Sequence, residues 1–183
     1  MSQDADAVDE DADAVNGDAD DAIYFEDVEP GTVIDCGSTT VTESDVVEFA
    51  ERFDPLPMHT DPDAAAEGRF GGLVASGYHT LSLSVRLLVE AVRRDRAVIA
   101  GLGIDDVRWH APVRPGDEIR VVDEVLDTRP SESDPETGII HESITVTNDA
   151  DETVLTLENH ELIERRERRD GGIERGDGST ESA

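Results

Sequence analysis

Apolar residues recur at helical spacing from about residue 42 onward. Positions i, i+3, i+4 and i+7 are filled by Val46, Phe49, Ala50 and Phe53. This spacing places them on one face of an amphipathic helix. Thr42 opens a stretch that resembles a capping box, and Pro55 disfavours helical dihedral angles at the residue before it. The pattern therefore predicts a helix over 42–53.

A second, longer helical pattern runs from about 76 to about 94. Its apolar residues cover most of the circumference of a helix, which is typical of a buried one. Arg86 and Glu90 mark its open edge. Between these two helices a short one is expected to begin near Pro62, with Thr60 or Asp61 as its cap.

The strand-like stretches lie on either side of these helices. Residues 31–41 are rich in β-branched side chains, and further runs follow at 103–110, 118–128, 139–148 and 153–163. The sequence "RPGD" at 114–117 is a turn signal, and short links of this kind imply antiparallel neighbours. The chain is therefore expected to form an α+β fold, with a long central helix wrapped by a curved antiparallel sheet.

The two ends of the chain offer little to bury. Residues 1–21 alternate mainly between Asp and Ala, and 165–183 are charged and then rich in Gly and Ser. Both are expected to be disordered tails. This leaves one folded domain over 22–164, which is long enough for a sizeable core.

Charge narrows the list of partners. The chain carries 45 acidic and 15 basic residues, with a formal net charge of -30, and every basic residue except histidine is Arg. At about 1 M salt the Debye length falls to roughly 3 Å, which screens such self-repulsion. The composition resembles that of proteins from halophilic archaea. It disfavours nucleic acid as a partner.

Cysteine content and hydropathy argue against disulfide-linked, cysteine-metal and membrane-spanning proteins. Cys36 is the only cysteine, so neither an internal disulfide nor a cysteine metal cluster can form. No apolar run reaches the roughly 18 residues of a membrane span. The N-terminus lacks the features of a signal peptide. We expect a cytoplasmic protein without a membrane partner.

The stretch "FDPLPMHT" holds an acid and an imidazole on a stiff tether. Asp54 and His59 are separated by two prolines, Pro55 and Pro57, which fix two φ angles. An acid and an imidazole held together can both contact one water, so that one takes its proton while the other donates or orients. Alternatively, Asp54 caps a turn and His59 is a surface residue.

The stretch "FGGLVASGYHT" leads into the predicted long helix. Gly71 and Gly72 allow tight backbone paths. Gly77, near the helix start, leaves a bare N–H that can stabilise an oxyanion. The alternative is that these glycines only permit close packing of helix on sheet.

The remaining candidates have weaker signals. Asp61 is explained as a helix cap, and Asp63 as an acid in the first turn of a helix, where acids are favoured. A metal site that combines them with Asp54 and His59 is therefore not predicted. Trp109 could line a pocket, but core packing explains it equally well. The other histidines are expected to be structural or surface residues: His79, His110, His141 and His160.

"FDPLPMHTDPDAAAEGRFGGLVASGYHT" followed by "VRWHAPVRPGDEI" resembles the MaoC-like dehydratases, a branch of the hot-dog fold that includes (R)-specific enoyl-CoA hydratases. The resemblance covers about 24–163. Asp54, Pro57 and His59 match the hydratase motif in type and spacing. Leu56 stands where the motif has Asn, and Phe53 where it commonly has Gly. These departures bring a simple straight-chain enoyl-CoA substrate into question.

The resemblance implies a reversible syn addition of water to a 2-enoyl-CoA, giving a (R)-3-hydroxyacyl-CoA. It implies that Asp54 and His59 are the catalytic pair and that the Gly77 N–H meets the thioester oxygen. Coenzyme A would be part of the substrate, no separate cofactor or metal is expected, and the subunits would form a homodimer or a higher homo-oligomer.

Two alternatives keep the same fold. One is a thioesterase, and the other is an acyl-thioester-binding protein without turnover. Only Arg can meet the CoA phosphates, and five residues are candidates: Arg93, Arg94, Arg96, Arg108 and Arg114. For the first three, the alternative is a favourable interaction with a helix C-terminus.

Overall fold

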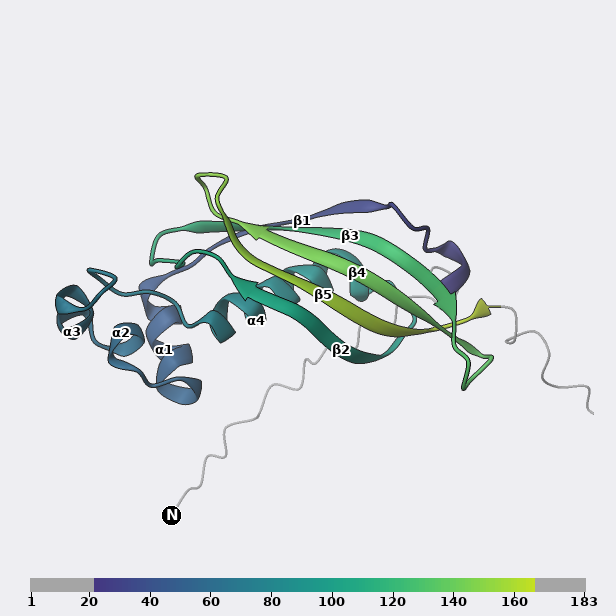
Figure 1. Ribbon diagram of the computed structural model, residues 1–183, viewed down its shortest axis with the longest axis horizontal. Helices are drawn as coiled ribbons and strands as arrows, with labels where there is room; N and C mark the ends of the chain where they lie inside the picture. Colours follow the sequence, from purple (N-terminus) through teal and green to yellow (C-terminus); the bar gives the residue numbers. More distant parts are fainter. Residues whose placement is uncertain (1–21, 167–183) are drawn as a thin grey trace, which may run out of the picture.

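Five antiparallel strands form one curved sheet, in the order β1-β3-β4-β5-β2 (Figure 1). The computed structural model describes residues 22–166. Along β4 and β5, nearly every second residue is buried, because successive side chains of a strand point to opposite faces of the sheet. The strand bounds are β1 Val33–Thr40, β2 Val98–Trp109, β3 Glu118–Pro130, β4 Thr137–Thr147 and β5 Thr153–Glu164.

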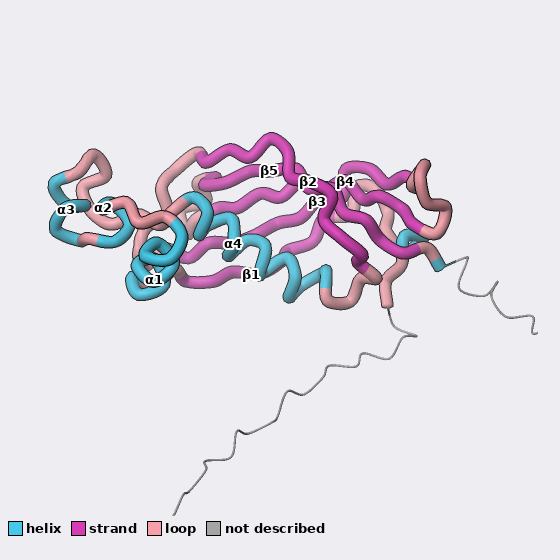
Figure 2. The backbone as a smooth tube through the Cα atoms, turned by 90° about the horizontal axis from the view of Figure 1, so that it is seen from below, coloured by secondary structure: helices cyan, strands magenta, loops and turns pink. Residues whose placement is uncertain are grey.

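The central helix lies across one face of this sheet (Figure 2). It consists of α4, Gly77–Leu88, which continues without a break into the π-helical turn η2, Val89–Arg93. Leu87, Leu88 and Val92 are buried in the same apolar cluster as residues of the sheet. The expected helix over about 76–94 and the hot-dog arrangement are confirmed.

The central helix is more open than its sequence predicted. Arg86 and Glu90 are exposed as expected, and they form an ion pair of 3.9 Å. However, Tyr78 is 61% exposed and Val89 is 39% exposed. Tyr78 and Val89 therefore lie on a face of the helix that the sheet of this chain does not cover.

Three helices gather beside the start of α4 (Figure 1). They are α1 Glu43–Phe53, α2 Pro57–Thr60 and α3 Pro62–Glu67. Thr42 caps α1 by accepting from the Asp45 N–H at 3.1 Å. Asp61 caps α3, because its side chain accepts hydrogen bonds from the backbone N–H groups of Asp63 and Ala64. Asp61 rather than Thr60 is therefore the cap.

Several boundaries differ from the sequence prediction. Sequence reasoning did not predict α2, since the 54–60 segment with its two prolines looks like a loop. Strand β2 begins at Val98, five residues before the predicted start, and its pairing with β5 is interrupted by bulges near Gly101 and Gly103. Glycine in a strand weakens the sequence signal and often marks a bulge.

The first residues after 164 contact the start of the described chain. Arg165 forms an ion pair of 3.0 Å with Glu26, which lies in the 3-10 turn η1, Phe25–Asp27. The expected tails, 1–21 and the remainder of 165–183, lie outside the described residues. Within 22–166, no helix is long and apolar enough to cross a membrane.

Candidate active site

The acid and the imidazole are positioned by the junction of α1 and α2. Asp54 ends α1, and its N–H donates to the Ala50 carbonyl at 2.9 Å. The chain then turns, and Pro57 occupies the first position of α2, where its missing N–H costs nothing. His59 follows in the same short helix. The two prolines therefore set a turn and a helix start, which together fix both side chains.

Asp54 and His59 face one another. His59 Nε2 lies 3.6 Å from Asp54 Oδ2, which is longer than a hydrogen bond. The imidazole is buried, and the Asp54 side chain is 22% exposed. On its other side, His59 Nδ1 lies 2.7 Å from the Val74 carbonyl oxygen. This geometry allows both groups to contact one small molecule between them.

Ser76 also contacts Asp54, which sequence reasoning missed. Its hydroxyl donates to Asp54 Oδ2 at 2.7 Å. Ser76 is the N-cap of α4, and its Oγ accepts from the Tyr78 N–H at 3.2 Å. The available signal was a serine directly before the expected helix start, which indicates a cap but not which acid it meets.

Gly77 begins α4 in the wall of the site. Its N–H belongs to the first turn, where helical N–H groups have no partner within the helix. Its carbonyl accepts from Trp109 Nε1 at 2.9 Å. A Cβ built at Gly77 would lie 2.7 Å from that same nitrogen. Close packing against the indole therefore requires glycine here, whatever the N–H does.

These groups open onto one cavity of about 430 Å³. Asp54, His59 and Gly77 all line it, and the rest of its wall is mainly apolar. Trp109, 48% exposed, forms part of this wall instead of the core. His110 is also in the wall, where its Nε2 bonds to Thr156 Oγ1 at 2.8 Å. Other wall residues are Leu56, Met58, Phe70, Tyr78 and Pro112.

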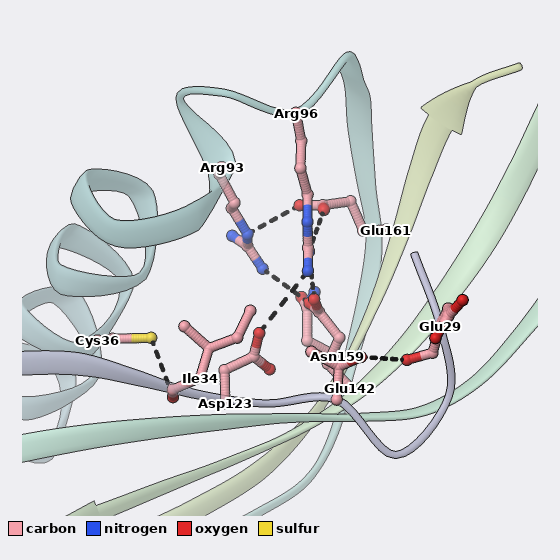
Figure 3. Close-up of polar contacts among 10 residues, drawn as sticks. Glu29, Ile34, Cys36, Arg93, Arg96, Asp123, Glu142, Asn159 and Glu161 are labelled. Carbon is pink, nitrogen blue, oxygen red and sulfur yellow. Dashed lines mark hydrogen bonds and ion pairs between the residues drawn. The ribbon is translucent and has the colours of Figure 1, made fainter. Parts of the chain in front are cut away.

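Two of the five candidate phosphate-binding arginines are held elsewhere (Figure 3). Arg93 pairs with Glu161 at 2.8 Å, and Arg96 is buried in ion pairs with Glu142, Glu161 and Asp123. Their helix end lies roughly 24 Å from Gly77 at about 1.5 Å per residue. Arg93 and Arg96 are thus engaged by carboxylates of the sheet, at the end of the central helix away from Gly77. Both arginines lie at the C-terminal end of the central helix, as the alternative explanation assumed, but the groups they pair with are carboxylates of the sheet.

The other three arginines differ in position. Arg94 is exposed at the same distant helix end. Arg108 is exposed beside Trp109 and pairs with Asp106 at 3.5 Å. Arg114 donates from its guanidinium to the Phe70 carbonyl at 2.8 Å, and Phe70 lines the cavity. Arg114 is thus bonded to one residue of the cavity wall, and Arg108 directly precedes another, Trp109.

The remaining histidines lie away from the catalytic pair. His79 is buried and stacks on Phe49 at 4.7 Å, and burial lowers the pKa of its imidazole. His141 and His160 stack on each other at 4.4 Å, on adjacent strands. These three are structural or surface residues, as expected. His110 is the exception, because it reaches the cavity.

Comparison with known proteins agrees with this fold. The family model described as "MaoC like domain" matches residues 27–147. An uncharacterized protein of Bacillus subtilis, YdeM, is 36% identical over 135 residues, which cover 74% of this chain and 94% of that protein. The chain therefore belongs to the MaoC-like dehydratase family, a group of hydro-lyases with the hot-dog fold.

Two further relatives extend the comparison. The crystal structure of a MaoC-like dehydratase from Rhodospirillum rubrum is 34% identical, with a TM-score of 0.72 over 79% of this chain and 99% of that one. The 3-hydroxyacyl-thioester dehydratase Z of Mycobacterium tuberculosis is 34% identical over 89 residues, 48% of this chain and 59% of that protein. The second match spans only part of either protein.

Proposed function

We propose that this chain is an enoyl-CoA hydratase that adds water reversibly to a 2-enoyl-CoA and forms a (R)-3-hydroxyacyl-CoA. The observation that carries the proposal is the convergence of Asp54 and His59, 3.6 Å apart, on a cavity that also contains the first turn of α4. Family membership supports the reaction type, and the name of the M. tuberculosis relative supports a thioester substrate.

Asp54 and His59 would hold one water against C3 of the enoyl thioester. One proton must leave that water and one must reach C2, and a positioned acid–base pair supplies both needs. Dehydration of the 3-hydroxyacyl thioester is the same path in reverse. Both groups lie on one side of the cavity, which favours syn addition, as in the (R)-specific hydratases that the motif resembles.

The thioester oxygen gains negative charge when water attacks C3. The Gly77 N–H, in the first turn of α4, would meet this oxygen. N–H groups at a helix N-terminus favour negative charge, and the enclosed site strengthens the interaction. Neither a metal nor a separate cofactor is needed for this chemistry.

The cavity wall suggests an apolar acyl chain. Leu56 replaces the asparagine of the hydratase motif, and it lines the cavity beside Met58 and Phe70. A polar contact is lost and apolar surface is gained, which favours an acyl group that fills this side. Arg108 and Arg114, which neighbour the wall residues Trp109 and Phe70, would meet the CoA phosphates, because a guanidinium suits bidentate phosphate contact.

The direct test is turnover of a panel of straight, branched and dicarboxylic enoyl-CoAs in high salt. We expect loss of enoyl absorbance without release of free thiol. Asp54→Asn and His59→Ala should each lower kcat about 10²–10⁴-fold, the usual contribution of a general acid or base. His160→Gln is a matched control, because His160 bonds to Asp105 on the outer face of the sheet.

Other outcomes identify the alternatives. Thiol release would indicate a thioesterase, and binding of crotonyl-CoA without loss of absorbance would indicate a non-catalytic binding protein. Near-wild-type turnover in Asp54→Asn or His59→Ala, with an unchanged circular dichroism spectrum, would remove the pair from catalysis.

A further inference from the structure

Ser76 is fully enclosed between the catalytic pair and the central helix. Its exposure is 0%, and its side-chain oxygen has two partners, the Tyr78 N–H at 3.2 Å and Asp54 Oδ2 at 2.7 Å. A buried hydroxyl with two partners has a definite direction, because it carries a single hydrogen. That direction bears on the protonation of Asp54.

The backbone fixes the direction of this chain of hydrogen bonds. The Tyr78 N–H can only donate, so it occupies a lone pair of Ser76 Oγ. The hydroxyl hydrogen is then left for Asp54 Oδ2, which must accept it. If Asp54 instead donated a proton to Ser76, the buried hydroxyl hydrogen would lack an acceptor, which is costly. Asp54 Oδ2 is thus held without a proton.

A second backbone group fixes the imidazole in the same way. The Val74 carbonyl can only accept, so His59 Nδ1, 2.7 Å away, must carry a hydrogen. In the neutral ring, Nε2 then has a free lone pair. This nitrogen is the one that faces Asp54 Oδ2 at 3.6 Å. Both groups that face the cavity are therefore proton acceptors in the resting state.

We infer that Ser76 is a positioning residue that holds Asp54 Oδ2 as a hydrogen-bond acceptor, so that His59 Nε2 carries the proton of the reaction. This assignment rests on the proposed hydratase function. Asp54 orients the water and stabilises the imidazolium that forms. Ser76 touches neither water nor substrate, and it acts through Asp54.

The proton route balances with one carrier. His59 Nε2 takes a proton from water as the oxygen bonds to C3, and the electrons of the C2=C3 bond move toward the thioester oxygen. The enolate electrons then return, and C2 takes the proton from His59 Nε2. Water is thereby added across C2 and C3, and the neutral imidazole is restored. The water that His59 activates and the proton that His59 returns both reach the substrate from the side of the imidazole, which agrees with syn addition.

Three variants of Ser76 test the assignment. Ser76→Ala and Ser76→Gly both remove the hydroxyl, and glycine is tolerated at an N-cap with only a few tenths of a kcal/mol lost. We expect kcat to fall about 10²-fold in both, the scale of a misplaced catalytic group, with KM nearly unchanged. Ser76→Thr keeps the hydroxyl and should retain most of kcat.

Thr42→Ala is the matched control. It removes the N-cap of α1, the helix that ends at Asp54, without touching the catalytic pair. It should lower the thermal midpoint as Ser76→Ala does and leave kcat unchanged. Wild-type kcat in both Ser76→Ala and Ser76→Gly, or an equal loss in Thr42→Ala, would overturn the positioning role.

A readout without turnover separates this inference from the hydratase proposal. ¹⁵N imidazole spectra of the labelled protein, with His59 identified by its absence from His59→Gln, should show hydrogen on Nδ1 and a bare Nε2. Ser76→Ala should keep this tautomer, because the Val74 carbonyl that fixes it is unchanged, so its loss of kcat would arise at Asp54. If the wild type hydrates an enoyl-CoA but carries the imidazole hydrogen on Nε2, the proton route is rejected and the hydratase function stands. Failure of every enoyl-CoA, with Nδ1–H intact, would reject the hydratase and its route together.

Discussion

At the scale of single residues, Gly77 combines two requirements at one position. Its N–H is the proposed partner of the thioester oxygen, and its missing side chain makes room for Trp109. The indole donates to the Gly77 carbonyl at 2.9 Å and also packs edge-on to Tyr78, with ring centroids 5.9 Å apart. Packing against the indole requires glycine, and a side chain at this position would also displace the N–H that is proposed to meet the thioester oxygen.

A double-mutant cycle can separate these two requirements. Gly77→Ala should lower kcat/KM at least about tenfold and destabilise the fold by about 1–3 kcal/mol, the usual cost of overpacking. Trp109→Leu removes the atoms that the new methyl group meets. The double variant should therefore lose less stability than the two single variants together. Additive losses in urea unfolding would show that the contact with Trp109 is not the reason for glycine.

The residues of the proposed catalytic site differ in how far apart in sequence their partners lie. Asp54 and His59 are predictable, because their relation is local and set by two prolines. Ser76 and Val74 reach the same pair from 22 and 15 residues away. A sequence pattern shows that Ser76 caps a helix, but only the fold brings that cap to Asp54. The role of Ser76 was therefore outside the reach of sequence reasoning.

At the scale of elements, the end of the central helix is joined to the sheet by buried charge (Figure 3). Three carboxylates from adjacent strands, Asp123, Glu142 and Glu161, face the guanidiniums of Arg93 and Arg96. The negative charge exceeds the positive charge by one. Burial, followed by the charge of Glu142, raises the pKa of Asp123 to about 7.

Asp123 should therefore make stability depend on pH. Because its folded pKa exceeds the ordinary value of 3.8, its contribution is fully present below about pH 4 and is lost as pH rises through about 7. The groups that act on it are Glu142 on β4, Arg96 and Arg93 at the helix end. The buried Cys36 thiol on β1 is also near, and its own pKa is raised to about 11, chiefly by burial. These groups favour a neutral Asp123 on balance.

Asp123→Asn tests this by imitating the protonated acid. The variant should come close to the wild type at about pH 4 and exceed its free energy of unfolding at pH 8 by on the order of a few kcal/mol. Urea unfolding at constant high salt measures both values. Asp127→Asn, an exposed change on the same strand, is the control. If the difference in unfolding free energy were the same at about pH 4 and at pH 8, the folded pKa of Asp123 would not be raised.

Helix and strand periodicity predicted most elements, and the misses have local causes. Helix α2 was hidden by the prolines that begin it, and the start of β2 by the glycines of its bulges. The buried charge cluster was misread for a different reason. Arg93 and Arg96 look like a cationic surface patch in sequence, because their carboxylate partners lie on distant strands, the nearest in sequence being Asp123 and the others at least 46 residues away. Long-range pairing is what a single sequence does not display.

At the scale of the whole molecule, strong charge coexists with exposed apolar surface. The chain carries a formal net charge of -30, yet the edge strand β2 exposes Ile99, Leu102 and Ile104 at 44–51%. Unpaired, apolar strand edges are normally covered. The opposite edge strand, β1, exposes Val33 at 61%. The exposed Tyr78 and Val89 of the central helix add to the uncovered apolar surface.

We expect two copies to pair through β2 and to separate as salt is removed. Apolar contact along this edge favours the dimer, while the repulsion between two chains of charge -30 opposes it and is screened only at high ionic strength. Light scattering should show a dimer at about 2 M KCl and dissociation toward about 0.1 M. Leu102→Asp, on β2, should give a monomer even at high salt. Val33→Asp, which adds the same charge to the opposite edge, should remain dimeric. A wild-type monomer at about 2 M KCl, or equal disruption by both variants, would contradict pairing through β2.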